Sequence, residues 1–104
     1  MATQISEDEF LNSPGVGDWQ VDDGVAVAHF HTGSFSAGVE FLTEIARIAD
    51  DANHHPDVEL TYPMVTLRLI THDAGGVLTT LDVALAQDIS RIGEEMGFEA
   101  EPRA

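Results

Sequence analysis

Three of the five histidines in this chain lie close together in the sequence, with an acidic residue nearby. His54 and His55 are adjacent and are followed by Pro56, and His72 lies further along the chain. Imidazole is the side chain best suited to proton transfer near neutral pH. Asp50 precedes His54 by four residues, so the two can meet on one helical face, where a carboxylate favours the protonated imidazole. The cluster therefore predicts general acid and base catalysis.

The two adjacent imidazole rings should point in different directions. A residue that precedes proline is pushed out of the α region, so His55 should be extended where it meets Pro56. One ring could then exchange a proton while the other shapes or binds the substrate. Alone, such a pair is more typical of a solvated helix end, so this interpretation depends on the rest of the cluster.

A metal site is an alternative use of the same side chains. Asp50, His54, His55 and His72 are acceptable ligand types for zinc or iron. However, adjacent histidines rarely chelate one ion together, and the cluster contains no His-x-His or His-x3-His pair. We therefore disfavour a metal site.

The elements that would position these residues begin with a short helix and a hairpin. Ser6 and Glu9 have capping-box spacing, which predicts a helix through about Leu11. An Asp-Gly turn at residues 22–24 separates two apolar segments and predicts strands over 19–21 and 25–30. His29 and His31 alternate with Phe30, and we expect them to be surface or edge residues.

A long helix is expected from Phe35 to about Ala52, with Ser34 as its N-cap. The apolar residues predicted to face the core are Phe35, Val39, Leu42, Ile45, Ala46 and Ala49. Phe41 and Ile48 lie off this stripe. They could form either the edge of the core or a second apolar surface for a partner subunit.

After Pro56 the apolar period becomes two, which predicts a second hairpin with strands over 58–62 and 65–70. The return strand would bring His72 back beside Pro56, with Thr71 and Asp73 flanking it as hydrogen-bond partners. The glycine pair at 75–76 ends this strand.

The last helix is expected from the Thr79 N-cap to about Met96. Its predicted buried face consists of Leu81, Leu85, Ile89, Ile92 and Met96. Asp82 stands where it would close a capping box, and we favour that role over a catalytic one. The order α-β-β-α-β-β-α predicts an α+β fold, a four-stranded antiparallel sheet with helices packed on one face.

The composition limits the function classes. The 104 residues predict a single domain, with residues 1–5 and 98–104 expected to be flexible. Cysteine is absent, which excludes disulfides and thiolate catalysis. The net charge of -15 disfavours binding to nucleic acid or anionic membranes. The sequence shows no apolar membrane span and no signal peptide, so we expect a cytoplasmic protein.

The spacing Asp50-x3-His54-His55-Pro56-x5-Tyr62-x9-His72-x9-Asp82 resembles the signature of the pterin-4a-carbinolamine dehydratases. Further matches are Gly17-Asp18-Trp19, Phe30, Phe35, residues 71–76 and Leu81-Asp82-x2-Leu85-Ala86. The resemblance extends from about residue 6 to residue 96 and so covers nearly the whole chain.

This resemblance implies a 4a-hydroxytetrahydrobiopterin dehydratase, a carbon–oxygen lyase that converts 4a-hydroxytetrahydropterin to quinonoid dihydropterin and water. The family's fold is a four-stranded antiparallel sheet with helices on one side, in agreement with the predicted order. The resemblance also implies no metal, no bound cofactor, and a homodimer or homotetramer formed partly through helix packing. An aromatic amino acid hydroxylase would be the metabolic partner in tetrahydrobiopterin recycling.

The resemblance also implies roles for individual residues. His54 and His72 are the acid and base candidates, while His55 positions the pterin and Asp50 orients and charges His54. The expected substrate contacts are His54, His55, Pro56, Thr71, His72, Asp73 and Ala74. The supporting residues are Asp82 and Tyr62, with Tyr62 and Trp19 as candidate aromatic partners of the pterin.

A function of another class is also compatible with this fold. The chain could be a non-catalytic dimerisation partner, assembly factor or coactivator-like protein. Such a relative would be expected to lose histidines from the signature, and this chain retains all three.

Overall fold

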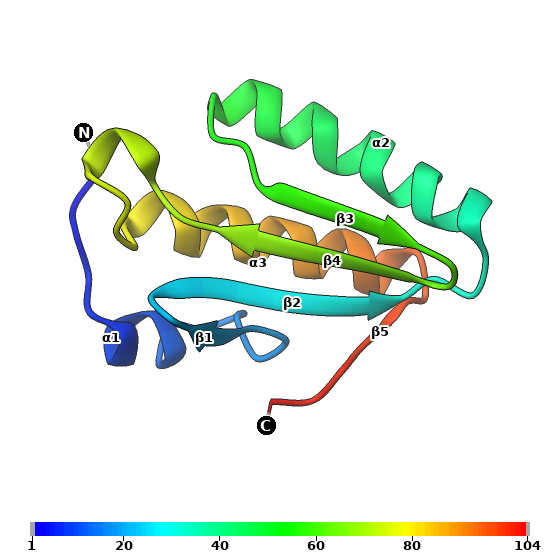
Figure 1. Cartoon of the computed structure of the whole chain (residues 1–104), viewed down its shortest axis with the longest axis horizontal. Helices are drawn as coiled ribbons and strands as arrows, with labels where there is room; N and C mark the ends of the chain where they lie inside the picture. Colours follow the sequence, from blue (N-terminus) through cyan, green and yellow to red (C-terminus); the bar gives the residue numbers. More distant parts are fainter. Residues whose placement is uncertain (1, 104) are drawn as a thin grey trace.

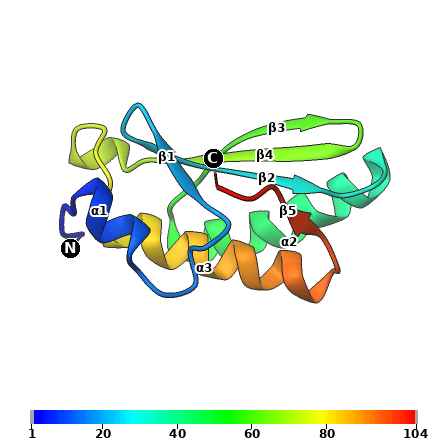
Figure 2. The same cartoon turned by 90° about the horizontal axis from the view of Figure 1, so that it is seen from below.

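The computed structural model describes residues 2–103 and shows an antiparallel sheet with the long helices on one side (Figures 1 and 2). The elements are α1 (Glu7–Leu11), β1 (Gln20–Asp22), β2 (Val25–His31), α2 (Phe35–Ala52), β3 (Asp57–Thr61), β4 (Met64–Leu69), the 3₁₀ turn η1 (His72–Ala74), α3 (Thr80–Glu95) and β5 (Glu99–Ala100). The predicted α+β fold is confirmed. Within residues 2–103, no helix is long and apolar enough to cross a bilayer.

The sheet has the strand order β1-β2-β4-β3, and every pair is antiparallel. The sequence missed β5, which pairs with β2 at Phe30 and His31. Because β4 occupies the other edge of β2, β1 and β5 follow one another along the same edge. Two residues are too short to show a period of two, so the pattern carried no signal for this strand.

The face of α2 that contacts the core differs from the predicted one. Phe41 is fully buried, and its ring packs edge-on against Phe30 and Phe98 at centroid distances of 5.1 Å and 5.3 Å. By contrast, Phe35 is 54% exposed and Val39 is 45% exposed. The predicted stripe was therefore wrong for these two residues and for Ala46, which is also exposed, although it was right for Ile45 and Ala49, which are buried. Phe41 is a core residue and not a surface for a partner.

A glycine explains this rotation of α2. A Cβ atom built on Gly38 would lie 2.5 Å from Leu60 Cδ1, so at this residue the helix lies too close to the sheet for a side chain to fit without a shift of Leu60. The side facing the sheet is therefore centred on Gly38, Phe41 and Ile45, with Leu42 partly buried beside it. Because glycine has no side chain, it does not contribute to an apolar stripe in the sequence. The apolar pattern therefore predicted the neighbouring face, through Phe35 and Val39, as the buried one.

The last helix follows its prediction more closely. Its capping box at Thr79 and Asp82 is present, and Leu85 and Ile89 are buried. Ile92 and Met96 are partly buried against the core. Leu81 was assigned wrongly, because it is 38% exposed in the first turn.

Residues near both ends of the described range contact the rest of the fold. The amide of Ile5 donates to the carbonyl of Leu78. The Arg103 guanidinium donates to the carbonyls of Leu11, Val16 and Trp19. The flexibility expected for residues 1–5 and 98–104 stays a prediction, and residues 1 and 104 lie outside the described part.

The excess of acidic residues predicts that the stability of the fold depends on salt. The chain has 19 acidic residues and 4 arginines, and Arg103 donates its hydrogen bonds to backbone carbonyls. Screening shortens the Debye length from about 30 Å at 0.01 M salt to about 3 Å at 1 M, so added sodium chloride should raise the melting temperature. Thermal unfolding followed by circular dichroism would check this. An unchanged melting temperature across that range would contradict it.

Candidate active site

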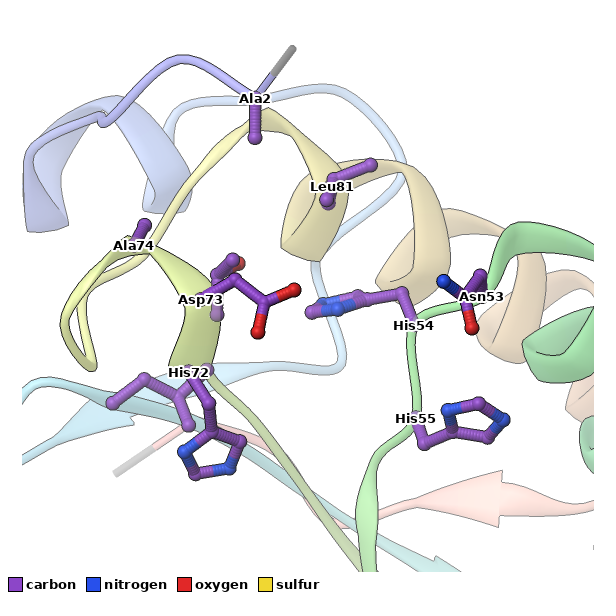
Figure 3. Close-up of a pocket in the computed structure, with 10 residues that line it drawn as sticks. Ala2, Asn53, His54, His55, His72, Asp73, Ala74 and Leu81 are labelled. Carbon is purple, nitrogen blue, oxygen red and sulfur yellow. The ribbon is translucent and has the colours of Figure 1, made fainter.

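A cleft of about 620 Å³ lies where the end of α2, the η1 turn and the start of α3 meet (Figure 3). This volume falls within the range of small-molecule sites. The lining residues are Ala2, Asn53, His54, His55, Ile70, Thr71, His72, Asp73, Ala74 and Leu81. The return of His72 toward the histidine pair, predicted from the β3–β4 hairpin, is confirmed.

The end of α2 determines how the two adjacent histidines point. Asn53 caps the helix in the left-handed conformation with φ of 50°, and the amide of His54 donates to the carbonyl of Ala49. Asparagine tolerates this backbone conformation better than most residues. The chain then turns, so that the rings of His54 and His55 point in opposite directions, with the ring of His54 toward Asp73 (Figure 3). The predicted divergence of the two rings is confirmed.

The carboxylate partner of His54 is Asp82 and not Asp50. His54 Nε2 lies 2.6 Å from Asp82 Oδ1, and both residues are buried. Asp50 instead contacts His55 Nε2 at 2.9 Å. The expected pairing of Asp50 with His54 was wrong because the helix ends at Ala52, before it could align residues four apart.

The Asp50–His55 pair is exposed, with side-chain exposures of 75% and 56%. An ion pair in water contributes little to stability, about 1 kcal/mol or less.

Asp82 joins the helix start to the candidate site. Its Oδ2 accepts from the amide of Thr79 at 2.9 Å, which is the predicted capping role. The same oxygen accepts from the hydroxyl of Thr71 at 2.8 Å, while Oδ1 faces His54. The helix cap and the contact with His54 are compatible. The structure shows that one carboxylate serves both.

The opposite wall of the cleft is the η1 turn, which follows β4. The His72 side chain makes no hydrogen bond to any residue in the described range 2–103, so the expected bonds from Thr71 and Asp73 are absent there. The Thr71 hydroxyl contacts Thr79 and Asp82 instead. The Asp73 carboxylate points toward the ring of His54 across the cleft (Figure 3).

The sequence of this chain matches a known protein family. The sequence profile of the family described as pterin 4 alpha carbinolamine dehydratase matches residues 3–92. The chain belongs to this family. Its resemblance to the dehydratase signature, seen first in the residue spacing, is thereby confirmed.

Relatives in this family match most of the chain. A Chloroflexus aurantiacus protein, provisionally named a pterin-4-alpha-carbinolamine dehydratase, is 44% identical over 75 residues, which are 72% of this chain and 80% of the relative. A Prochlorococcus marinus protein with the same provisional name is 35% identical over 100 residues, covering 91% of this chain and 100% of the relative.

Solved structures share the family's fold. A protein described as a transcriptional coactivator/pterin dehydratase from Brucella melitensis superimposes with a TM-score of 0.76 at 27% identity, covering 86% of this chain and 98% of that one. A pterin dehydratase-like protein described as a RuBisCO assembly factor in the alpha-carboxysome matches with a TM-score of 0.57 at 19% identity, covering 71% and 84%. The second likeness concerns the fold alone.

Besides Asp50 and Asp82, which contact the histidines, three residues expected at the site of this dehydratase family member do not line the cleft. Pro56 lines a neighbouring apolar groove, which His55 also borders. Tyr62 is 72% exposed and lies in the β3–β4 turn, at the other end of β4 from η1. Trp19 is fully buried, and its Nε1 donates to Ser90 Oγ. Trp19 was therefore wrong as an aromatic partner of the pterin.

The cleft has aliphatic walls that the sequence did not reveal. Ile70 and Leu81 line it together with Ala2 and Ala74. Ile70 and Leu81 had fitted a strand and a helix pattern, so nothing in the sequence distinguished them from core residues. Asn53 was also missed as a lining residue. In the described range, no group of three or more histidine or acidic side chains is arranged to hold a metal ion.

Proposed function

We propose that this chain is a dehydratase that converts 4a-hydroxytetrahydropterin to quinonoid dihydropterin and water. The observation that carries the proposal is that His54, His55 and His72 all line one cleft in a member of this family. The cleft is large enough for a bicyclic ring and has aliphatic walls for its faces.

The reaction is an elimination that needs two proton transfers. The bond between C4a and the hydroxyl oxygen breaks, and that oxygen takes a proton to leave as water. The N5–H proton goes to a base, and its electron pair forms the new bond between N5 and C4a. No electron acceptor is required, because the loss of water is not an oxidation. Histidine can serve both proton transfers near neutral pH.

His54 and His72 are the residues assigned to these transfers. They lie on opposite walls of the cleft, His54 after α2 and His72 in η1. His55, held by Asp50, would position the pterin at the edge of the cleft. The substrate contacts would be made by the histidines together with Thr71, Asp73 and Ala74, which line the same cleft.

The pathway follows from the substrate. The 4a-hydroxypterin is a product of aromatic amino acid hydroxylases, so such an enzyme would supply it and tetrahydrobiopterin recycling would consume the quinonoid product. A non-catalytic interaction protein is the alternative, and the exposed apolar side chains of Phe35 and Val39 favour it. The retained histidines and the buried His54–Asp82 contact favour the enzyme.

A direct assay tests the proposed function. Synthetic 4a-hydroxytetrahydropterin would be mixed with the protein in a stopped-flow spectrometer, and the formation of quinonoid dihydropterin would be followed. The wild type should accelerate dehydration in proportion to its concentration. A rate equal to that in buffer alone would refute the proposal. A protein carrying both His54→Ala and His72→Ala, purified in the same way, controls for contaminating enzymes.

We also propose that the chain forms a homodimer or homotetramer through the exposed face of α2. Phe35 and Val39 are both exposed there, and Val58 of β3 is 44% exposed. Val39→Glu should shift the assembly toward a smaller species, because it places a charge in an apolar contact.

Sedimentation velocity would measure the change in assembly. Arg47→Gln is the matched control, since it alters the net charge by the same amount on another flank of α2. An identical sedimentation coefficient for wild type and Val39→Glu would refute this use of the α2 face.

A further inference from the structure

We propose that Asp82 is a positioning residue that fixes the tautomer of His54, so that Nδ1 is the nitrogen that exchanges a proton with the substrate. The inference deepens the proposed dehydratase function and rests on it for the substrate. Its structural half, the position of the ring proton, can be measured without any substrate.

The hydrogen bonds around Asp82 define it as an acceptor. Its Oδ2 receives the amide of Thr79 and the hydroxyl of Thr71. Because the Thr71 hydroxyl is used as that donor, the 2.7 Å contact between Thr71 and Thr79 must be donated by Thr79. The Thr79 oxygen in turn accepts the amide of Leu81. The hydroxyl of Thr79 therefore donates to Thr71, and the hydroxyl of Thr71 donates to Asp82. Oδ2 of Asp82 accepts two hydrogen bonds, one from Thr71 and one from the amide of Thr79.

The remaining carboxylate oxygen determines where the proton of His54 lies. Oδ1 is 2.6 Å from Nε2, and Asp82 is fully buried. An ionised carboxylate can only accept, and imidazole holds a proton more tightly than a carboxylate does. Nε2 therefore carries the hydrogen and donates it to Asp82. The other tautomer would place a lone pair against a buried negative oxygen.

The second ring nitrogen of His54 is open. Among residues 2–103, Nδ1 has no hydrogen-bond partner. Over that same stretch, no buried side-chain nitrogen or oxygen lacks a partner, so Nδ1 must reach solvent. Since His54 lines the cleft, this is the nitrogen that a bound substrate would meet.

This arrangement supports proton exchange in either direction. A neutral His54 offers a lone pair at Nδ1, and a protonated His54 offers a hydrogen there. Because Asp82 also caps α3, the start of the helix and the orientation of the ring depend on one side chain.

The substitution Asp82→Asn tests the inference because it has the same shape. The amide oxygen would keep the two donors on the Oδ2 side, Thr79 and Thr71. Its amino group would then face Nε2, which would have to accept, and the ring proton would move to Nδ1. A comparable change in a serine protease triad lowers kcat by about 10⁴-fold. Here we expect kcat to fall by about 10²- to 10⁴-fold while KM changes by less than about threefold.

Two measurements would be made. Nitrogen-15 NMR of the histidine rings reports which nitrogen of His54 is protonated, and the dehydration assay reports kcat and KM. Ser34→Ala is the control, because it removes the hydroxyl that caps the start of α2, at the other end of that helix from His54, and touches neither Asp82 nor its hydrogen-bond partners. It should lower stability but keep the wild-type tautomer and a kcat within about threefold of wild type.

The outcomes separate this inference from the proposed function. The inference is supported if the proton of His54 moves to Nδ1 and kcat falls in Asp82→Asn but not in the control variant. An unchanged tautomer in Asp82→Asn, a kcat near that of wild type, or an equal loss in Ser34→Ala overturns the inference. If the wild type shows no dehydration, the proposed function fails, while the NMR result still decides whether Asp82 sets the tautomer.

Discussion

Alanine at either His54 or His72 is expected to lower kcat for dehydration by about 10²- to 10⁴-fold, the usual contribution of a general acid or base. The two side chains approach the cleft from different elements, so neither can replace the other. Each variant should approach the rate of the uncatalysed reaction. If a variant keeps more than about a tenth of the wild-type kcat, the substituted histidine is not one of the two residues that transfer protons.

The two variants should differ in stability. His54→Ala leaves the buried Asp82 carboxylate without its contact on Oδ1, which weakens the fold. His72 is exposed and forms no side-chain hydrogen bond within the described chain, so His72→Ala should unfold like the wild type. Urea denaturation of both variants identifies the conditions under which each is folded. The kcat values would be compared under those conditions.

His55→Ala is the matched comparison, since it removes an adjacent imidazole. The ring of His55 is exposed, points away from His54 and contacts Asp50. We expect its loss to raise KM with a much smaller effect on kcat, as for a group that binds substrate and transition state equally. A kcat loss as large as that of His54→Ala would give His55 a chemical role instead.

The parts of the fold that depend on local sequence could be predicted. The Asp-Gly hairpin between β1 and β2, the capping boxes of α1 and α3 and the length of α2 each depend on neighbouring residues. The place of His72 followed from the pairing of β3 with β4. These features depend on residues that are only a few positions apart, so they can be read from the sequence itself.

The contacts within the site could not be predicted in the same way. The His54–Asp82 contact joins residues 28 positions apart, and it requires the left-handed cap at Asn53. No periodicity in the sequence indicates that turn, so the sequence predicted the nearer Asp50 as the partner of His54. Tyr62 fitted the signature spacing, but the hairpin places it at the far end of β4 from the cleft.

The orientation of α2 was undetermined for a different reason. The helix carries two adjacent apolar stripes, one through Phe35 and Val39 and the other through Phe41 and Ile45. Both have helical spacing, and only packing against the sheet selects between them. The helix lies close to the sheet at Gly38, and in this orientation the side chain of Phe41 is buried in the core.

Phe41→Ala should therefore lower the free energy of unfolding by about 3–5 kcal/mol, the usual cost of removing a buried phenylalanine. The side chain is fully buried between Phe30 and Phe98, so the truncation leaves a cavity that those two rings can fill only in part. Urea denaturation with fluorescence from the buried Trp19 would measure the change.

Phe35→Ala is the control on the same helix, and we expect it to cost less than about 1 kcal/mol, because that side chain is 54% exposed. Self-association through the α2 face would add to the apparent cost of Phe35→Ala, so both substitutions belong in the Val39→Glu background, where this contact is weakened. If Phe35→Ala cost more than Phe41→Ala in that background, the stripe through Phe35 would be the core face after all. The opposite order would establish that α2 packs through Phe41 and leaves the stripe through Phe35 and Val39 free for a second copy of the chain.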